Sequence, residues 1–190
     1  SDRLFVSGNS YTGSHNTSFS VVRYGNVMGS RGSVIPFFIS IKDGQPFPIT
    51  DNRMTRFMIS LEEGVKLVWH AFDDMKGGEI YVKKIPSMKV TDIALAIDNK
   101  AKQKEVGIRP GEKLHEQMIG QEDALYTYEY PDYFKILPSI YDWSQDPERI
   151  GDGTRVPENF MYTSDNNKEW MKISELQDWI EANKNKIGNV

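Results

Sequence analysis

The chain has 190 residues, of which 38% are apolar and 26% charged, and its net charge is −4 at pH 7. The absence of cysteine excludes disulfides and cysteine-bound metals, and an acidic balance without a basic stripe argues against nucleic acid as a main partner. No run of apolar residues is long enough to predict a membrane span, so a cytoplasmic location is the default expectation. The apolar share is low for an α/β domain, and we therefore expect part of the apolar surface to meet a partner.

The first elements are expected in the order helix, strand, loop and helix. Leu4, Phe5 and Tyr11 suggest the last turns of a helix already under way, so Ser1 is interpreted as a cut point in a longer chain. The apolar run over 19–25 predicts a buried strand, and 34–41 predicts a short helix.

The central segment contains the clearest predicted helix. Prolines punctuate a loop over 46–51, and a short extended run follows at 56–59. Ser60 is then expected to cap a helix. Its apolar residues at intervals of three or four predict a stripe that packs firmly, formed by Leu61, Val65, Val68, Phe72 and Met75.

The remaining elements continue the β/α alternation. A strand is expected over 79–83, followed by a helix capped by Thr91. An extended run over 104–119 is broken by Pro110 and Gly111 before a helix, and the segment over 125–140 forms either strands or an irregular aromatic arm. An acidic loop over 142–158 and a last helix capped by Ser174 complete the chain. The alternation predicts an α/β fold.

The turn between the first strand and the helix at 34–41 is the first candidate ligand site. Free N–H groups at a helix start favour an anion, and an arginine side chain binds phosphate oxygens bidentately. Simpler interpretations exist for single residues. Asn26 could be a turn residue that bonds its own backbone, and Arg31 or Arg56 alone could be a solvated surface arginine. Arg109 and Glu112 could form a local ion pair.

The histidines do not support a metal site. His15, His70 and His115 are scattered along the chain and lack supporting carboxylates, so no metal is predicted.

Three segments carry a resemblance to a known family: Arg23 to Pro36, Ile49 to Phe57 and Gly107 to Glu116. In this order they resemble the UDP-N-acetylglucosamine 4,6-dehydratases, and more narrowly the inverting enzymes of pseudaminic acid biosynthesis. These belong to the extended short-chain dehydrogenase/reductase superfamily. The resemblance runs through essentially the whole chain, yet it corresponds only to the C-terminal half of such an enzyme.

This resemblance implies the C-terminal part of a Rossmann-type parallel sheet with a small mixed α/β substrate-binding domain. Residues 1–45 would form the end of the dinucleotide-binding domain with the substrate loop. Residues 46–190 would form mainly the substrate-binding domain with a C-terminal arm and helix.

The resemblance also implies a set of ligand contacts. Val27 would offer its backbone to the nicotinamide end of NADP, and Asn26 would touch the sugar or diphosphate. Arg56 would contact a phosphate, Arg109 would hold the diphosphate, Thr50 would lie against the nucleoside, and Glu112 would accept hydrogen bonds from ribose hydroxyls. The residues that would line the substrate are Arg31, Gly32, Ser33 and Val34.

The family's catalytic motifs are not in this chain. The glycine turn G-x-x-G-x-x-G, the acidic or Thr-Asp-Lys segment and the Tyr-x-x-x-Lys pair all occur earlier in the family's chains, and Ser1 to Phe5 is similar to the residues just after that lysine. We therefore expect no catalytic residue here and no activity of this chain alone. The expected partners are a UDP-sugar, the missing N-terminal half and further copies in a homo-oligomer.

The activity implied for the whole enzyme is an NADP-dependent removal of water from a UDP-amino sugar, giving a 4-keto-6-deoxy sugar for surface glycans or flagellin. Two alternatives stay open. A related 4-epimerase or capsule-type dehydratase/epimerase would share the phosphate contacts, although the tail over 159–170 favours the inverting group. A non-catalytic nucleotide-sugar binding or assembly module is the other alternative.

Overall fold

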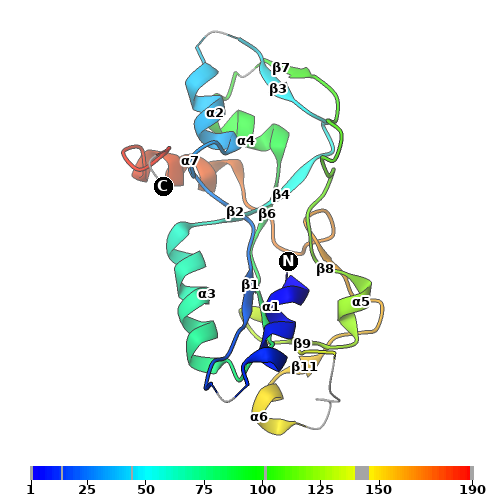
Figure 1. The fold of residues 1–190 in the computed structure, drawn as a ribbon. Helices are drawn as coiled ribbons and strands as arrows, with labels where there is room; N and C mark the ends of the chain where they lie inside the picture. Colours follow the sequence, from blue (N-terminus) through cyan, green and yellow to red (C-terminus); the bar gives the residue numbers. More distant parts are fainter. Residues whose placement is uncertain (1, 14, 44, 101, 140–145, 189–190) are drawn as a thin grey trace. The chain divides into compact units, whose positions relative to one another are not determined.

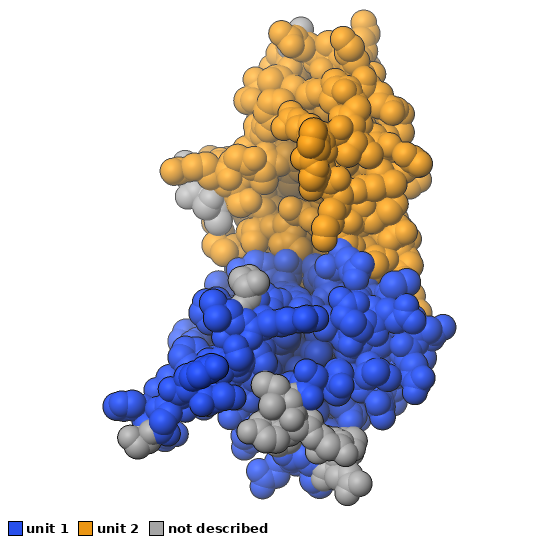
Figure 2. Space-filling view, turned by 45° about the vertical axis from the view of Figure 1, so that its right-hand side comes forward, with its two compact units in different colours: residues 1–24, 62–84, 117–162 blue, residues 25–61, 85–116, 163–190 orange. Residues whose placement is uncertain are grey.

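The computed structural model describes residues 2–13, 15–43, 45–100, 102–139 and 146–188. They form two compact units, each assembled from three stretches of chain (Figure 2). Unit 1 comprises residues 1–24, 62–84 and 117–162, and unit 2 comprises residues 25–61, 85–116 and 163–190. Each unit takes chain from both sides of residue 45. The predicted division into the end of a dinucleotide-binding domain (1–45) and a mainly substrate-binding domain (46–190) stays a prediction.

Unit 1 contains a five-stranded mixed sheet in the order β1-β5-β10-β9-β11. Strands β1 (Val21–Arg23) and β5 (Ile80–Lys83) are parallel, whereas β10 (Tyr133–Ile136), β9 (Thr127–Glu129) and β11 (Thr154–Arg155) join by antiparallel pairing. The other elements of this unit are α1 (Asp2–Gly8), the 3-10 helix η1 (Asn9–Tyr11), α3 (Leu61–Asp74), β8 (Gln117–Ile119), α5 (Gln121–Ala124) and α6 (Pro147–Ile150) (Figure 1). Strand β12 (Tyr162–Thr163) lies where the chain passes to unit 2.

The aromatic segment that follows α5 belongs to this sheet. Tyr128 and Tyr130 are buried, and the rings of Tyr130 and Tyr133 stack with centroids 4.5 Å apart. The prediction of strands over 125–140 is therefore confirmed for β9 and β10, and the alternative of an irregular arm is wrong. Residue 140, the last of this predicted segment, lies outside the described residues.

Helix α3 has the predicted extent but buries a different face. Gly64, Leu67 and Ala71 are buried, and Leu67 and Ala71 pack with Tyr81 of β5. The predicted stripe is mostly exposed: Leu61 by 44%, Val65 by 45% and Phe72 by 60%. The physical reason is tertiary contact, because the face that carries Leu67 and Ala71 is the one that packs against Tyr81.

Unit 2 is built from a three-stranded sheet, a separate strand pair and three helices. In the sheet β2 (Asn26–Val27) runs parallel to β4 (Thr55–Ile59), and β4 runs antiparallel to β6 (Ser87–Lys89). The pair consists of parallel β3 (Phe47–Ile49) and β7 (Gln103–Glu105). The helices are α2 (Val34–Ile41), α4 (Val90–Ile97) and α7 (Ile173–Ala182).

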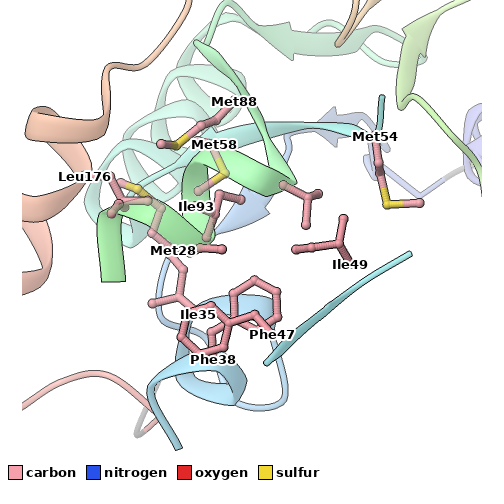
Figure 3. Close-up of a cluster of buried hydrophobic side chains, with 13 residues drawn as sticks. Met28, Ile35, Phe38, Phe47, Ile49, Met54, Met58, Met88, Ile93 and Leu176 are labelled. Atoms are coloured by element: carbon pink, nitrogen blue, oxygen red, sulfur yellow. The ribbon is translucent and has the colours of Figure 1, made fainter. Parts of the chain in front are cut away.

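One apolar cluster holds these elements together (Figure 3). Ile35 and Phe38 come from α2, Ile93 from α4 and Leu176 from α7. The ring of Phe38 stacks on that of Phe47, with centroids 4.9 Å apart and planes 5° from parallel. The three helices and β3 are thereby fixed around the sheet.

Several local predictions for unit 2 are confirmed or corrected. The helix over 34–41 and the extended run over 56–59 are confirmed. The loop over 46–51 is wrong in part, because Phe47–Ile49 pairs with β7, and Pro48 is tolerated in a sheet that has only edges. No helix follows Gly111 before β8 in the described chain.

Two helix starts also differ from the prediction. Helix α4 begins at Val90 after Lys89, so Thr91 lies inside it. Helix α7 begins at Ile173, and the side chain of Glu175 accepts a hydrogen bond from the Lys172 backbone N–H at 2.8 Å, so Ser174 is not the cap. The cap is supplied by an acidic side chain inside the first turn.

Candidate functional site

A cavity of about 460 Å³ lies within unit 2. It is formed by β2 and the turn after it, the start of α2, the end of β3, one face of β4 and the loop over 106–112. Its lining residues are Asn26, Val27, Met28, Gly32, Ser33, Val34, Ile35, Phe37, Phe38, Pro48, Thr50, Met54, Arg56, Met58, Val90, Val106, Arg109 and Glu112.

Close backbone approach positions the residues of β2. A Cβ atom at Gly25 would lie 2.5 Å from Cβ of Phe57 and 2.7 Å from its carbonyl oxygen, so only glycine fits there. This approach pairs Asn26 with Met58 and Val27 with Ile59. The Met28 N–H then donates to the Ile59 carbonyl at 2.8 Å, so the pairing with β4 continues into the turn after β2.

Helix α2 starts at the cavity wall. Ser33 is its N-cap residue and lines the cavity. Among the described residues, the buried Ser33 hydroxyl has no hydrogen-bond partner. Buried hydroxyls are normally paired, so this one is suited to a ligand that contributes the missing partner.

Strand β4 and the residue before it present alternate side chains to the cavity. Met54, Arg56 and Met58 line it, while Phe57 belongs to the buried side chains on the other face. The apolar members were missed at the level of sequence. The two-residue period around Arg56 was the signal that could have identified them.

Arg56 is held tightly by the protein. Its Nη1 donates to the carbonyls of Thr55 at 2.7 Å and Leu114 at 3.2 Å, and its Nη2 donates to the carbonyl of Lys113 at 3.2 Å. The side chain is only 17% exposed. Its hydrogen bonds therefore fix the loop that leads from the cavity to Glu116, in addition to placing a positive charge in the wall.

Arg109 is placed differently on the same loop. It is exposed at the cavity rim, and within the described chain its side chain makes no ion pair. The Glu112 backbone N–H donates to the Arg109 carbonyl at 3.0 Å, and the Arg109 backbone N–H reaches the Glu112 carboxylate at 3.3 Å. The turn thus holds the backbone while the guanidinium group stays available.

The loop ends in a polar network around Glu116. The Glu116 carboxylate accepts from the Phe57 backbone N–H at 2.7 Å and from the Asn26 amide nitrogen at 2.8 Å. The Glu116 backbone N–H donates to the Ser164 hydroxyl at 2.9 Å, and that hydroxyl lies 2.6 Å from Thr55 Oγ1. His115 Nδ1 lies 2.8 Å from the same Thr55 oxygen, so this histidine belongs to the network that anchors the loop.

The structure brings together all of the predicted site residues except one. Asn26, Val27, Gly32, Ser33, Val34, Thr50, Arg56, Arg109 and Glu112 line the cavity. Arg31 is exposed on the turn and is not among the lining residues. The ligand contacts of all these residues stay predictions.

The described residues contain no group of three or more His, Cys, Asp or Glu side chains that could hold a metal ion. No helix within the same part of the chain is long and apolar enough to cross a membrane.

Comparison with known proteins assigns the chain to a family. The family model described as "Polysaccharide biosynthesis protein" matches residues 1–138, and the chain belongs to this family. A Campylobacter jejuni protein named UDP-N-acetylglucosamine 4,6-dehydratase (inverting) is 50% identical over 187 residues, covering 95% of this chain and 56% of that protein.

Other relatives show how far the similarity extends. A UDP-glucose 4-epimerase of Rickettsia rickettsii is 34% identical over 184 residues, covering 94% of this chain and 54% of the relative. The X-ray structure of Pen from Bacillus thuringiensis has a TM-score of 0.80 and 33% identity, covering 96% of this chain and 54% of that one. The chain thus spans about half the length of these relatives, and its α/β fold is theirs.

Proposed function

We propose that this chain is the C-terminal, substrate-recognising half of an NADP-dependent UDP-N-acetylglucosamine 4,6-dehydratase that acts in surface-glycan or flagellin-sugar biosynthesis, of the pseudaminic acid type. The whole enzyme removes water from a UDP-amino sugar and gives a 4-keto-6-deoxy sugar, which makes it a lyase. One observation carries the proposal: the three motif-bearing segments meet around a single cavity in a chain 50% identical to a protein of that name.

The chemistry of the cavity wall supports a nucleotide-sugar ligand. A diphosphate needs fixed donors and positive charge, which Arg56, Arg109 and the N-terminus of α2 at Ser33 can supply. Thr50 and Glu112 offer hydroxyl and carboxylate groups to a nucleoside. Arg31, on the exposed turn, would reach the ligand only as it enters.

The residues of this chain offer little to the cofactor. Val27 lies in the cavity wall and its carbonyl already accepts from the Ser30 N–H at 3.2 Å, leaving its second lone pair for the nicotinamide end. When bound, NADP would supply the hydride-transfer chemistry of the reaction. The glycine turn and the Tyr-x-x-x-Lys pair are assigned to the other half of the enzyme, so this chain binds and orients the substrate.

A chimera tests this proposal directly. The part of the Campylobacter jejuni protein that this chain does not match is placed ahead of residues 1–190, and conversion of UDP-N-acetylglucosamine is followed by mass spectrometry and NMR. We expect loss of water and a 4-keto product from the chimera, and neither from the 190-residue chain alone. A chimera that binds NADP and melts cooperatively but leaves the substrate unchanged would refute the proposal.

The epimerase alternative is favoured by one observation, the 34% identity to the Rickettsia rickettsii protein. The same chimera is therefore incubated with UDP-glucose. Formation of a 4-epimer without loss of water would support the epimerase. Binding of UDP-sugars by the chain without turnover in any chimera would instead support a non-catalytic binding module.

Homo-oligomer formation and a cytoplasmic location stay predictions. Gel filtration with light scattering of the chimera tests the first, and fractionation of the source cells tests the second.

A further inference from the structure

We propose that Glu116 is a positioning residue that fixes the hydrogen-bonding polarity of Asn26, so that Asn26 receives a hydrogen bond from the sugar part of the ligand and does not bind its phosphates. This inference rests on the proposed function and assigns a role to a residue outside the predicted site.

The orientation of the Asn26 amide follows from its neighbours. One group beside its nitrogen is the Glu116 carboxylate at 2.8 Å, and the other is the Phe57 carbonyl at 3.4 Å. Both can only accept hydrogen bonds, so the Asn26 atom facing them is the NH₂ group. The other Asn26 amide atom is therefore its oxygen, Oδ1.

This arrangement leaves Asn26 with one kind of free group. Its nitrogen faces protein acceptors, and among the described residues its Oδ1 accepts no hydrogen bond. Asn26 also lines the cavity. A ligand group that meets Oδ1 must donate, which a sugar hydroxyl or the N-acetyl N–H can do and an ionised phosphate cannot.

Glu116 is itself held in one place. Its second carboxylate oxygen accepts from the Phe57 backbone N–H at 2.7 Å. Its backbone N–H donates to the Ser164 hydroxyl at 2.9 Å, and its carbonyl accepts from the Ser164 N–H at 2.8 Å. Because both ends of the residue are anchored, its carboxylate presents a fixed acceptor to Asn26.

The substitution Glu116→Gln reverses the polarity without changing the size of the side chain. The oxygen of the new amide must continue to accept from the Phe57 N–H, so its NH₂ group faces Asn26. The Asn26 amide then turns over to present its oxygen to that NH₂, giving up its longer 3.4 Å contact with the Phe57 carbonyl, and its own NH₂ faces the cavity. We expect the affinity for UDP-N-acetylglucosamine to fall about tenfold and the affinity for UDP to change less than about twofold.

A reciprocal exchange supplies the rescue. Asn26→Asp alone places two carboxylates side by side and should also weaken sugar-dependent binding. In the double variant Asn26→Asp with Glu116→Gln, one oxygen of the new carboxylate accepts from the new amide and the other stays an acceptor in the cavity. We expect the ratio of UDP-N-acetylglucosamine to UDP affinity to return to within about threefold of the original value.

The experiment is isothermal titration of UDP and UDP-N-acetylglucosamine into the 190-residue chain and these three variants, with melting curves for each. The expected result is that Glu116→Gln lowers the affinity for UDP-N-acetylglucosamine but not for UDP, and that the double variant recovers the ratio of the two affinities. If Glu116→Gln weakens both ligands equally, or the double variant does not recover, Glu116 only anchors the loop and the inference is overturned. If the original chain binds neither ligand, the proposed function fails for this chain and the inference fails with it.

Discussion

Arg56 and Arg109 lie in the same cavity wall but are coupled to the protein to different degrees. Arg56 donates to three backbone carbonyls, whereas the Arg109 guanidinium group is exposed and makes no ion pair with any described residue. Substitution of Arg109 should therefore affect ligand affinity alone, whereas substitution of Arg56 should affect both affinity and the stability of the fold.

We expect Arg109→Met to lower the affinity for UDP roughly 10- to 100-fold, because a charge-assisted hydrogen bond contributes about 1.5 to 3 kcal/mol, and to leave the melting temperature unchanged. Arg56→Met should lower both the affinity and the unfolding free energy, the latter by about 1 to 3 kcal/mol. Titration calorimetry and urea unfolding measure the two effects. Lys113→Met removes the same charge from the same loop outside the cavity lining and is the control.

The stability of the fold should depend on pH through Asp51, which follows the cavity-lining Thr50 in the chain. Hydrogen bonds from the Arg53 side chain and then its backbone N–H lower the pKa of Asp51 to about 2, below the value of about 3.9 in an unfolded chain. Because the folded-state pKa is the lower one, this carboxylate stabilises the fold fully above pH ~4 and loses its contribution as the pH falls toward 2.

We expect Asp51→Asn to reduce stability at pH 6 and to differ progressively less from the original chain as the pH falls through that range. Urea unfolding at a series of pH values measures this. A constant difference between the two chains across the series would contradict the assignment.

At the scale of elements, unit 1 contains a buried ion pair between Glu79 and Arg149 that joins β5 to α6. Glu79 is 1% exposed, and its carboxylate also accepts from the Gly77 backbone N–H at 2.7 Å. Removing Arg149 would leave a buried charge without its counterion.

Arg149→Met should therefore lower the unfolding free energy of unit 1 by about 3 to 5 kcal/mol. Lys184→Met, which breaks an exposed ion pair with Glu181, should cost less than about 0.5 kcal/mol. Chemical unfolding followed by fluorescence compares the two. Equal losses of unfolding free energy in the two variants would show that burial does not strengthen the contribution of the Glu79–Arg149 pair.

Helix α3 gives a second comparison at this scale. Leu67 is 3% exposed, whereas Trp69 is 64% exposed. Leu67→Ala should cost about 2 to 5 kcal/mol, and Trp69→Gln should change stability by less than about 0.5 kcal/mol. The reverse order, measured by urea unfolding, would contradict the packing of α3 through Leu67 and Ala71.

For the whole molecule, exposed apolar side chains gather on α3 and on the N-terminal helices α1 and η1. Helix α3 exposes Leu61, Val65, Trp69 and Phe72, and the N-terminal helices expose Leu4, Phe5 and Tyr11. Apolar surface of this kind favours association.

We expect the 190-residue chain to self-associate with rising concentration, and Trp69→Gln with Phe72→Gln to reduce the association without changing the melting temperature. Sedimentation velocity over a range of concentrations measures this. A monodisperse monomer at every concentration would contradict it.

Local sequence patterns by themselves determined much of this protein. The helix over 34–41, the strand within 56–59 and the helix beginning after Ser60 follow from apolar periodicity and turn residues, which act between neighbours in the chain. The same local patterns, with the family resemblance, identified the segments that carry Asn26, Arg56 and Arg109.

Only the tertiary structure decided which surfaces those elements bury and which side chains they share. The buried face of α3 is the one whose Leu67 and Ala71 meet Tyr81 of β5, and Phe47 becomes a strand residue because β7 lies beside it. The polarity of Asn26 depends on a carboxylate 90 residues away in the chain. Hydrogen bonds and packing between distant segments have no signature in the local periodicity, because each requires a partner that only folding brings into contact.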